Sequence, residues 1–222
     1  MADTEERLTV TTPKGDAPAA AIVPRRRTAM LVVAHGAGAG MDHPFITGFC
    51  RGAAHEGVAT LRFDFAYMAA GRRSPDPAPV AIASIGAAFE AASARAGKVP
   101  VLVGGKSYGG RMASMAVAEG LPAAGLVFLG YPLHPPGKTD RVRDEHLYGI
   151  AVPMLFLQGT RDPFADPQVL APVLRKLGAT ATHHAVDGGG HSLARSRKDD
   201  PRVVGASLAP IVAAWIAERV VG

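Results

Sequence analysis

The sequence is short of cysteine and has no long apolar run. Cys50 is the only cysteine in 222 residues, so an intrachain disulfide is excluded and a reducing compartment is expected. No uncharged stretch approaches the roughly 20 apolar residues that cross a bilayer. The start, MADTEERLTV, lacks the basic end and the apolar run of a secretion signal. We therefore expect a cytoplasmic protein without a membrane partner.

A concentrated basic surface is also missing. The net charge of +5 would suit a nucleic-acid partner, but the charges are dispersed along the chain. The one dense cluster, Arg25 to Arg27, flanks an apolar run, where a solvated strand edge is a better interpretation than a binding patch. No nucleic-acid-binding motif accompanies this cluster, and we expect no nucleic-acid partner.

What is present fits one domain of ordinary size, residues 1–222. Hydrophobic residues make up 48% of the chain, which is enough for a sizeable core. The central apolar runs are continuous, as is typical of strands buried on both faces of a parallel sheet. A weakly alternating run at 8–12 is consistent with an edge strand. The other β-rich runs cover residues 28–36, 58–65, 99–104, 124–130, 152–157 and 181–186.

Segments with helical spacing or composition lie between these runs. Asp166 is predicted to cap one of them, with Pro167 at the first helical position. Alternating strands and helices predict an α/β fold with a mainly parallel central sheet and helices on both faces. The predicted helical segments are 44–56, 79–96, 111–119, 166–177 and an apolar stripe over 203–216.

The stretch VLVGGKSYGG, residues 101–110, allows two interpretations. Its GGKS resembles the end of a phosphate-binding loop, which needs a glycine five positions before Gly105. That position is Pro100, which lacks a backbone N–H and has a fixed φ, so a phosphate cradle is disfavoured. Gly105 to Gly109 also form G-x-S-x-G, the turn that presents a nucleophilic serine between a buried strand and a helix. The flanking patterns meet this second requirement and favour Ser107 as a nucleophile.

A serine nucleophile needs a base, and the base needs an orienting carboxylate. In this architecture the chain order is serine, then acid, then histidine, with the last two after later strands. Asp162 follows one late run and His191 lies in a glycine-rich loop after the last run. We therefore predict Ser107, Asp162 and His191 as a catalytic triad. Asp166 resembles a helix cap, and Asp187 lies within the histidine loop, where it is badly placed to orient the imidazole.

The glycine-rich stretch VVAHGAGAG is expected to complete an oxyanion hole. One N–H should come from Tyr108, the residue after the nucleophile, and the other from a loop after an early strand. We predict the N–H of Ala37 for the second, with Gly36 or Gly38 as alternatives. Lys106 is expected to point to the sheet edge or to solvent, without a catalytic role. The residues expected to bind substrate are His35, which also anchors its loop, Gly36, Tyr67 and His134.

The connection between Gly130 and Val152 has room only for a Pro-rich turn and one short helix. Hydrolases of this general architecture often carry a lid domain at this place. We therefore predict a lidless, open site that suits short and soluble acyl substrates.

Several motifs together carry a family resemblance. The chain resembles the small, lidless bacterial serine α/β-hydrolases of the dienelactone-hydrolase-like sort, and it is similar to a eukaryotic branch that includes a subunit of a nuclear acetyltransferase complex. The resemblance runs from Thr28 to the C-terminus and implies an α/β-hydrolase fold with Ser107, Asp162 and His191 as the triad. A dienelactone hydrolase proper has a cysteine nucleophile, so the serine here argues against that particular activity. The motifs are HGAGAGMDHPF, LRFDF, GGKSYGGR, GYPLHPPGK, LQGTRDPF and GGGHSL.

The expected function is hydrolysis of short-chain carboxylic esters through an acyl-enzyme intermediate, with no metal and no cofactor. A small-molecule acyl ester is the expected partner. A thioester or an amide as the scissile bond stays open, and so does the oligomeric state. A non-catalytic binding or scaffold protein on a hydrolase fold is the rival from another class, because fold does not fix function. A complete set of triad residues argues against that rival.

Overall fold

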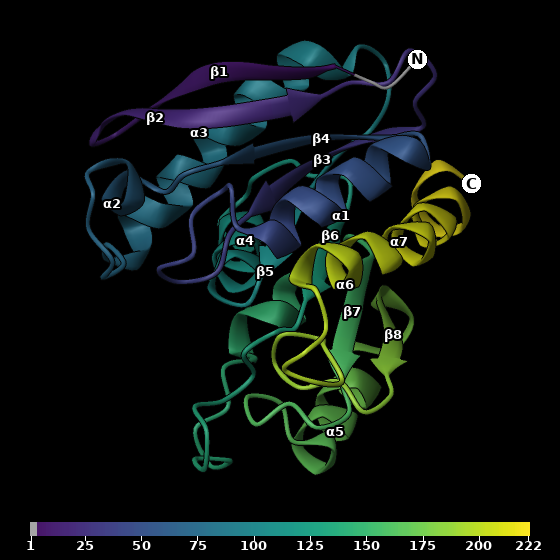
Figure 1. Cartoon of the computed structure of the whole chain (residues 1–222). Coiled ribbons are helices and arrows are strands. Elements are labelled where there is room, and N and C mark those ends of the chain that lie inside the picture. Colours follow the sequence, from purple (N-terminus) through teal and green to yellow (C-terminus); the bar gives the residue numbers. More distant parts are fainter. Residues whose placement is uncertain (1–3) are drawn as a thin grey trace.

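A computed structural model describes residues 4–222, which are organised around one eight-stranded sheet (Figure 1). The strand order is β1-β2-β4-β3-β5-β6-β7-β8; β1 and β2 are antiparallel, and β3 to β8 run parallel. This confirms the predicted α/β class. The strands are β1 Glu5–Thr12, β2 Gly15–Ile22, β3 Ala29–Ala34, β4 Val58–Phe63, β5 Val101–Lys106, β6 Leu126–Leu129, β7 Met154–Gly159 and β8 Ala181–Val186.

Helices cover both faces of the sheet, because the central strands are apolar on both sides. On β3, Leu31 and Val33 pack toward one helical layer, whereas Met30 and Val32 pack toward the other. The first layer holds α1 Pro44–His55, α6 Pro201–Ser207 and α7 Ala209–Ile216. The second holds α2 Ala66–Ala69, α3 Ala78–Ala96, α4 Tyr108–Ala118 and α5 Pro167–Leu177. Short helical turns are η1 Glu145–Gly149, η2 Gly178–Thr180 and η3 Ala217–Val221.

The hairpin β1-β2 forms one edge of the sheet, and β8 forms the other (Figure 1). The predicted edge strand at 8–12 is confirmed and begins earlier, at Glu5. The sequence pattern did not predict β2. The buried guanidinium of Arg62, on β4, contacts Glu5 on β1 and Asp42 in the loop before α1, both at 3.0 Å. This ionic cluster ties the edge hairpin to the loop that follows β3.

The strand order changes direction at β3, and this places the functional loops. The chain passes from β3 to β4 on one side and then returns to β5 on the other side of β3. In open α/β sheets, ligands bind outside the carboxyl ends of the strands at such a switch point. The loop that begins at His35 and the turn at Ser107 leave adjacent strands there.

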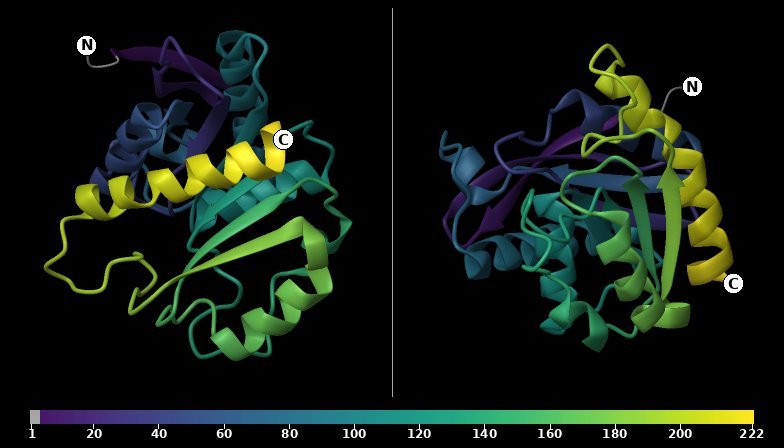
Figure 2. Two further views of the ribbon diagram at one scale, coloured as in Figure 1. Left: turned by 90° about the vertical axis from the view of Figure 1, so that its right-hand side faces the viewer. Right: turned by 90° about the horizontal axis from the view of Figure 1, so that it is seen from below.

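The C-terminal helical segment, Pro201–Val221, is long and apolar enough to cross a membrane by length and composition alone. Figure 2 shows it running across one face of the sheet. On its α7 part, Val212 and Ile216 are fully buried, and the Trp215 indole donates a hydrogen bond to Thr182 on β8, at 3.1 Å. These side chains belong to the apolar layer that packs against one face of the sheet.

Candidate active site

Ser107 lies in a strained turn between β5 and α4. Its backbone has φ 51° and ψ −114°, which is rare for a residue with a side chain. A Cβ atom at Gly105 would overlap the carbonyl oxygen of Ala34, and one at Gly109 would meet the same atom. The two glycines of the G-x-S-x-G motif therefore let the turn pass against the end of β3, and the serine hydroxyl projects above the sheet.

The structure brings together the three residues that the sequence selected. His191 Nε2 lies 2.7 Å from Ser107 Oγ, and His191 Nδ1 lies 2.8 Å from Asp162 Oδ2. The buried carboxylate of Asp162 accepts a hydrogen bond from the Nδ1–H of His191. This leaves Nε2 unprotonated and able to accept the proton of the Ser107 hydroxyl. Asp187, which lies in the same loop as His191, is exposed. Its backbone carbonyl accepts a hydrogen bond from the Arg195 side chain.

Gln158, at the end of β7, holds the acid in place. Its side-chain amide donates to Asp162 Oδ2 at 2.5 Å, and its amide oxygen accepts the N–H of Tyr131 at 2.8 Å. The N–H of Phe164 donates to Asp162 Oδ1 at 2.8 Å. Sequence reasoning missed Gln158. The available signal was a glutamine at the end of an otherwise apolar strand, which needs partners when it is buried.

Phe164 and His134 support the same corner of the site. The Phe164 ring lies against the His191 imidazole, with centroids 4.2 Å apart. His134 is buried. Its backbone N–H donates to the Phe164 carbonyl, and its ring Nε2 accepts the backbone N–H of Asp166 at 2.9 Å. The structure thus places His134 behind the acid loop, away from the cavity in which substrate contact was expected.

The loop after β3 is anchored by side chains that were expected to bind substrate. His35 is buried, donates from Nδ1 to Gly36 O at 2.7 Å, and accepts the N–H of Phe65 at Nε2. Burial lowers the pKa of His35, consistent with this neutral form. The Tyr67 hydroxyl accepts the N–H of Gly38 at 3.0 Å. His35 and Tyr67 therefore shape this loop and do not line the cavity.

These contacts narrow the choice of oxyanion donors. The N–H of Gly38 is occupied by Tyr67, which removes one of the alternatives to Ala37. Within residues 4–222, the Ala37 N–H donates to no backbone carbonyl. Tyr108 is the first residue of α4, where a backbone N–H has no acceptor inside the helix. Both predicted donors are therefore free to bind an anion.

A cavity of about 690 Å³ adjoins Ser107 and His191. Of the residues predicted to bind substrate, only Gly36 lines it. Its walls are largely apolar, and exposed side chains of the loop after His191 form its rim. The lining residues are Gly36, Ala37, Ala39, His43, Phe45, Ile46, Lys106, Ser107, Phe164, His191, Ser192, Ala194, Ser196, Arg197, Asp199, Pro201 and Val204.

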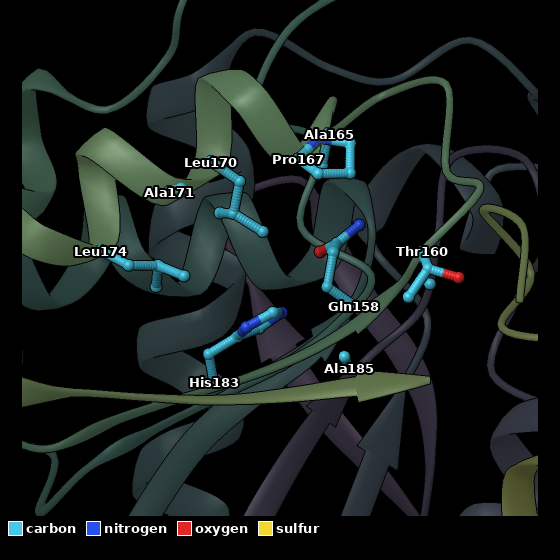
Figure 3. A pocket seen from close by; sticks show the side chains of 10 residues that line it. Gln158, Thr160, Ala165, Pro167, Leu170, Ala171, Leu174, His183 and Ala185 are labelled. Atoms are coloured by element: carbon cyan, nitrogen blue, oxygen red, sulfur yellow. The ribbon is translucent and has the colours of Figure 1, made fainter. Parts of the chain in front are cut away.

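A smaller hollow of about 210 Å³ lies between α5 and the strands β7 and β8. Figure 3 shows Leu170, Leu174 and His183 around it. Neither Ser107 nor His191 lines this hollow, and its link to the site is Gln158, which borders it. Ser107 and His191 line the larger cavity, which is therefore the candidate substrate site.

A second serine–histidine contact joins α4 to η1. Ser114 Oγ lies 2.8 Å from His146 Nε2, but the same hydroxyl donates to the Arg111 carbonyl, also at 2.8 Å. The histidine must therefore donate to the serine, the reverse of what a general base does. Ser114 is also fully buried. This pair is a structural link between two helices.

Comparison with known proteins places the fold in a family. The family model described as "Alpha/beta hydrolase domain" matches residues 27–216. A serine hydrolase without a lid from Xanthomonas campestris is 21% identical, with a TM-score of 0.73 over 95% of this chain and 94% of that chain.

Two further solved structures are similar over nearly the whole chain. A dienelactone hydrolase from Anabaena variabilis is 18% identical, with a TM-score of 0.75 over 99% of this chain and 100% of that chain. The esterase domain of a Rhodothermus marinus protein is 21% identical, with a TM-score of 0.69 and the same coverage, 99% and 100%. The connection between β6 and β7 holds only a loop and η1. This chain belongs to the α/β-hydrolase domain family and has the lidless form of its fold.

Proposed function

We propose that this protein is a serine hydrolase that cleaves short-chain carboxylic esters. The observation that carries the proposal is the chain of hydrogen bonds from Asp162 through His191 to Ser107 at the wall of an apolar cavity. The strained backbone at Ser107 supports the same assignment, because such strain is concentrated at functional sites.

In the first half-reaction, Ser107 Oγ attacks the ester carbonyl carbon while His191 Nε2 takes the hydroxyl proton. Asp162 keeps the Nδ1 proton in place and stabilises the imidazolium that forms. The carbonyl oxygen becomes an oxyanion, which the N–H groups of Tyr108 and Ala37 stabilise by about 3 kcal/mol each. His191 then gives its proton to the leaving alcohol, and the acyl group remains on Ser107.

In the second half-reaction, His191 takes a proton from a water molecule, and the resulting hydroxide attacks the acyl carbon. The tetrahedral intermediate collapses, Ser107 Oγ leaves and regains the proton, and the carboxylic acid departs. The apolar side chains of Phe45, Ile46 and Val204 line the cavity and suit an acyl or alkyl group. The esterase named among the similar structures supports an ester over a thioester or an amide.

The test uses a fluorophosphonate probe, which labels activated serines, and p-nitrophenyl acetate as substrate. We expect labelling and turnover in the wild type, and a loss of both in Ser107→Ala. Ser114→Ala is the matched control, because Ser114 also contacts a histidine but lies outside the cavity. An unlabelled and inactive wild type would favour the scaffold alternative. Labelling that survives in Ser107→Ala would contradict the site assignment.

A further inference from the structure

Lys106 has no role in the reaction described above, yet it lies in the active site. It is the last residue of β5, directly before Ser107, and it lines the same cavity. Its ammonium donates a hydrogen bond to the backbone carbonyl of His191, with Nζ and O 2.5 Å apart. The side chain therefore points across the site to the base, in contrast to the sheet edge or solvent that the sequence suggested.

The His191 carbonyl depends on this ammonium. Within residues 4–222, no backbone N–H donates to it. The backbone hydrogen bonds of this loop are made to the carbonyls of neighbouring residues instead. The N–H of Arg161 donates to the Gly189 carbonyl at 2.8 Å, and the N–H of Leu193 donates to the Gly190 carbonyl at 2.9 Å. Leu193 is buried with a positive φ of 65°, which is unfavourable for a residue with a side chain. His191 therefore lies in a strained loop, and its backbone carbonyl is held by the Lys106 side chain.

The surroundings of the Lys106 ammonium leave space for this contact, and they make it costly to keep the side chain charged. A Cβ atom at Gly130, after β6, would lie 3.1 Å from Lys106 Nζ and 3.1 Å from the His191 oxygen, so the missing side chain leaves room for both groups. Burial lowers the pKa of Lys106 to about 8, against the opposing effect of the Asp162 carboxylate. Within the described residues, no carboxylate lies within salt-bridge distance of Nζ.

We propose that Lys106 is a positioning residue that holds His191 by its backbone carbonyl and so keeps the imidazole in reach of Ser107. The proposal rests on the proposed function, because it assigns a task within that reaction. Asp162 fixes the ring at Nδ1 and Phe164 covers one face of it, but neither contact restrains the backbone of the base. The Lys106 bond supplies that restraint.

The first test is Lys106→Met, which keeps the unbranched stem up to the ε position and removes the donor. We expect kcat for p-nitrophenyl acetate and the rate of fluorophosphonate labelling to fall between about 10- and 100-fold, as small displacements of a catalytic group do. KM should stay nearly unchanged. The melting temperature should stay equal or rise, since replacing a buried charge with an apolar group is often neutral or stabilising. Lys14→Met, in the exposed turn between β1 and β2, is the matched control.

The second test is chemical rescue of Lys106→Cys. Aminoethylation of the new thiol rebuilds an ammonium of nearly the original length, whereas propylation gives a neutral side chain of similar size. Cys50 should not react, because it is fully buried and burial raises its pKa to about 12. We expect aminoethylation to restore turnover and propylation to leave it low. Aminoethylated wild-type protein controls for reaction at other sites.

The outcomes separate this proposal from the proposed function. A labelled wild type with unchanged rates in Lys106→Met, or equal rescue by the propyl group, overturns the positioning role and leaves the serine hydrolase intact. A raised KM with unchanged kcat also overturns it, because Lys106 would then bind substrate. A wild type that the probe does not label overturns both proposals.

Discussion

Ser107 combines a side chain with a backbone conformation that glycine adopts far more easily. Strain of this kind costs on the order of 1–3 kcal/mol, and the turn keeps it because β5 and α4 fix the chain on both sides. The hydroxyl is thereby held away from the sheet and directed to His191. The proposed nucleophile is positioned at the expense of stability.

This argument predicts that Ser107→Gly is more stable than Ser107→Ala. Both substitutions remove the hydroxyl, but only glycine accepts φ 51° without strain. We expect the free energy of unfolding to be at least about 1 kcal/mol higher for Ser107→Gly, measured by urea denaturation monitored by circular dichroism. Equal stabilities would show that the backbone at this turn is not strained.

The candidate site could be predicted from the sequence only where residue type and chain order decide the role. A serine, an aspartate and a histidine, in that chain order and each after a different predicted strand, were sufficient to select Ser107, Asp162 and His191. The roles of Tyr67 and His134 could not be predicted in this way. A hydroxyl or imidazole near a site can face substrate or accept a backbone N–H, and the sequence does not show where those donors lie.

Among the secondary-structure elements, α5 shows how local chemistry fixes a boundary. Asp166 accepts the N–H of Gln168 at 2.8 Å, and Pro167 occupies the first helical position. Both features were predicted, because a cap and a proline act within a few residues. The strand β2, GDAPAAAI, was missed for the opposite reason. Its residues have little intrinsic strand preference, and pairing with β1 and β4 holds it in place.

The α5 cap gives a prediction about stability alone. Asp166→Ala should lower the free energy of unfolding by about 1 kcal/mol, because one helical N–H loses its acceptor. Turnover of p-nitrophenyl acetate per folded molecule should be retained, since the backbone N–H of Asp166 still binds His134. Gln168→Ala, exposed on the same first turn, is the control and should leave thermal stability unchanged. A large loss of turnover in Asp166→Ala would show that the cap also sets the acid loop.

At the scale of the whole molecule, Lys106 links stability to pH. Its folded-state pKa of about 8 lies below 10.5, the ordinary value for a lysine side chain. Between these values the unfolded chain therefore binds more protons than the folded protein. The free energy of unfolding then rises with pH across this window, because deprotonation removes the cost of burying an ammonium. Over the same pH window, the hydrogen bond from Lys106 to the His191 carbonyl loses its charged donor.

We therefore expect stability and activity to change in opposite directions above pH 8. Relative to Lys106→Met, the wild type should become more stable between about pH 8 and pH 10, and its kcat advantage should shrink. Urea denaturation and initial rates at each pH measure the two effects, and the difference between variants cancels the titration of other groups. A wild type that loses stability relative to Lys106→Met over this range would contradict the sign of the shift.

The absence of a lid also bears on what ends the catalytic cycle. Ser192, Ser196 and Arg197 at the cavity rim are exposed, so solvent can enter the cavity that holds the proposed acyl-enzyme. Nothing in this arrangement selects water over a small alcohol as the second nucleophile. The ratio of acid to new ester is then set by the composition of the medium, and in a methanol-rich mixture the same triad would act as an acyl transferase.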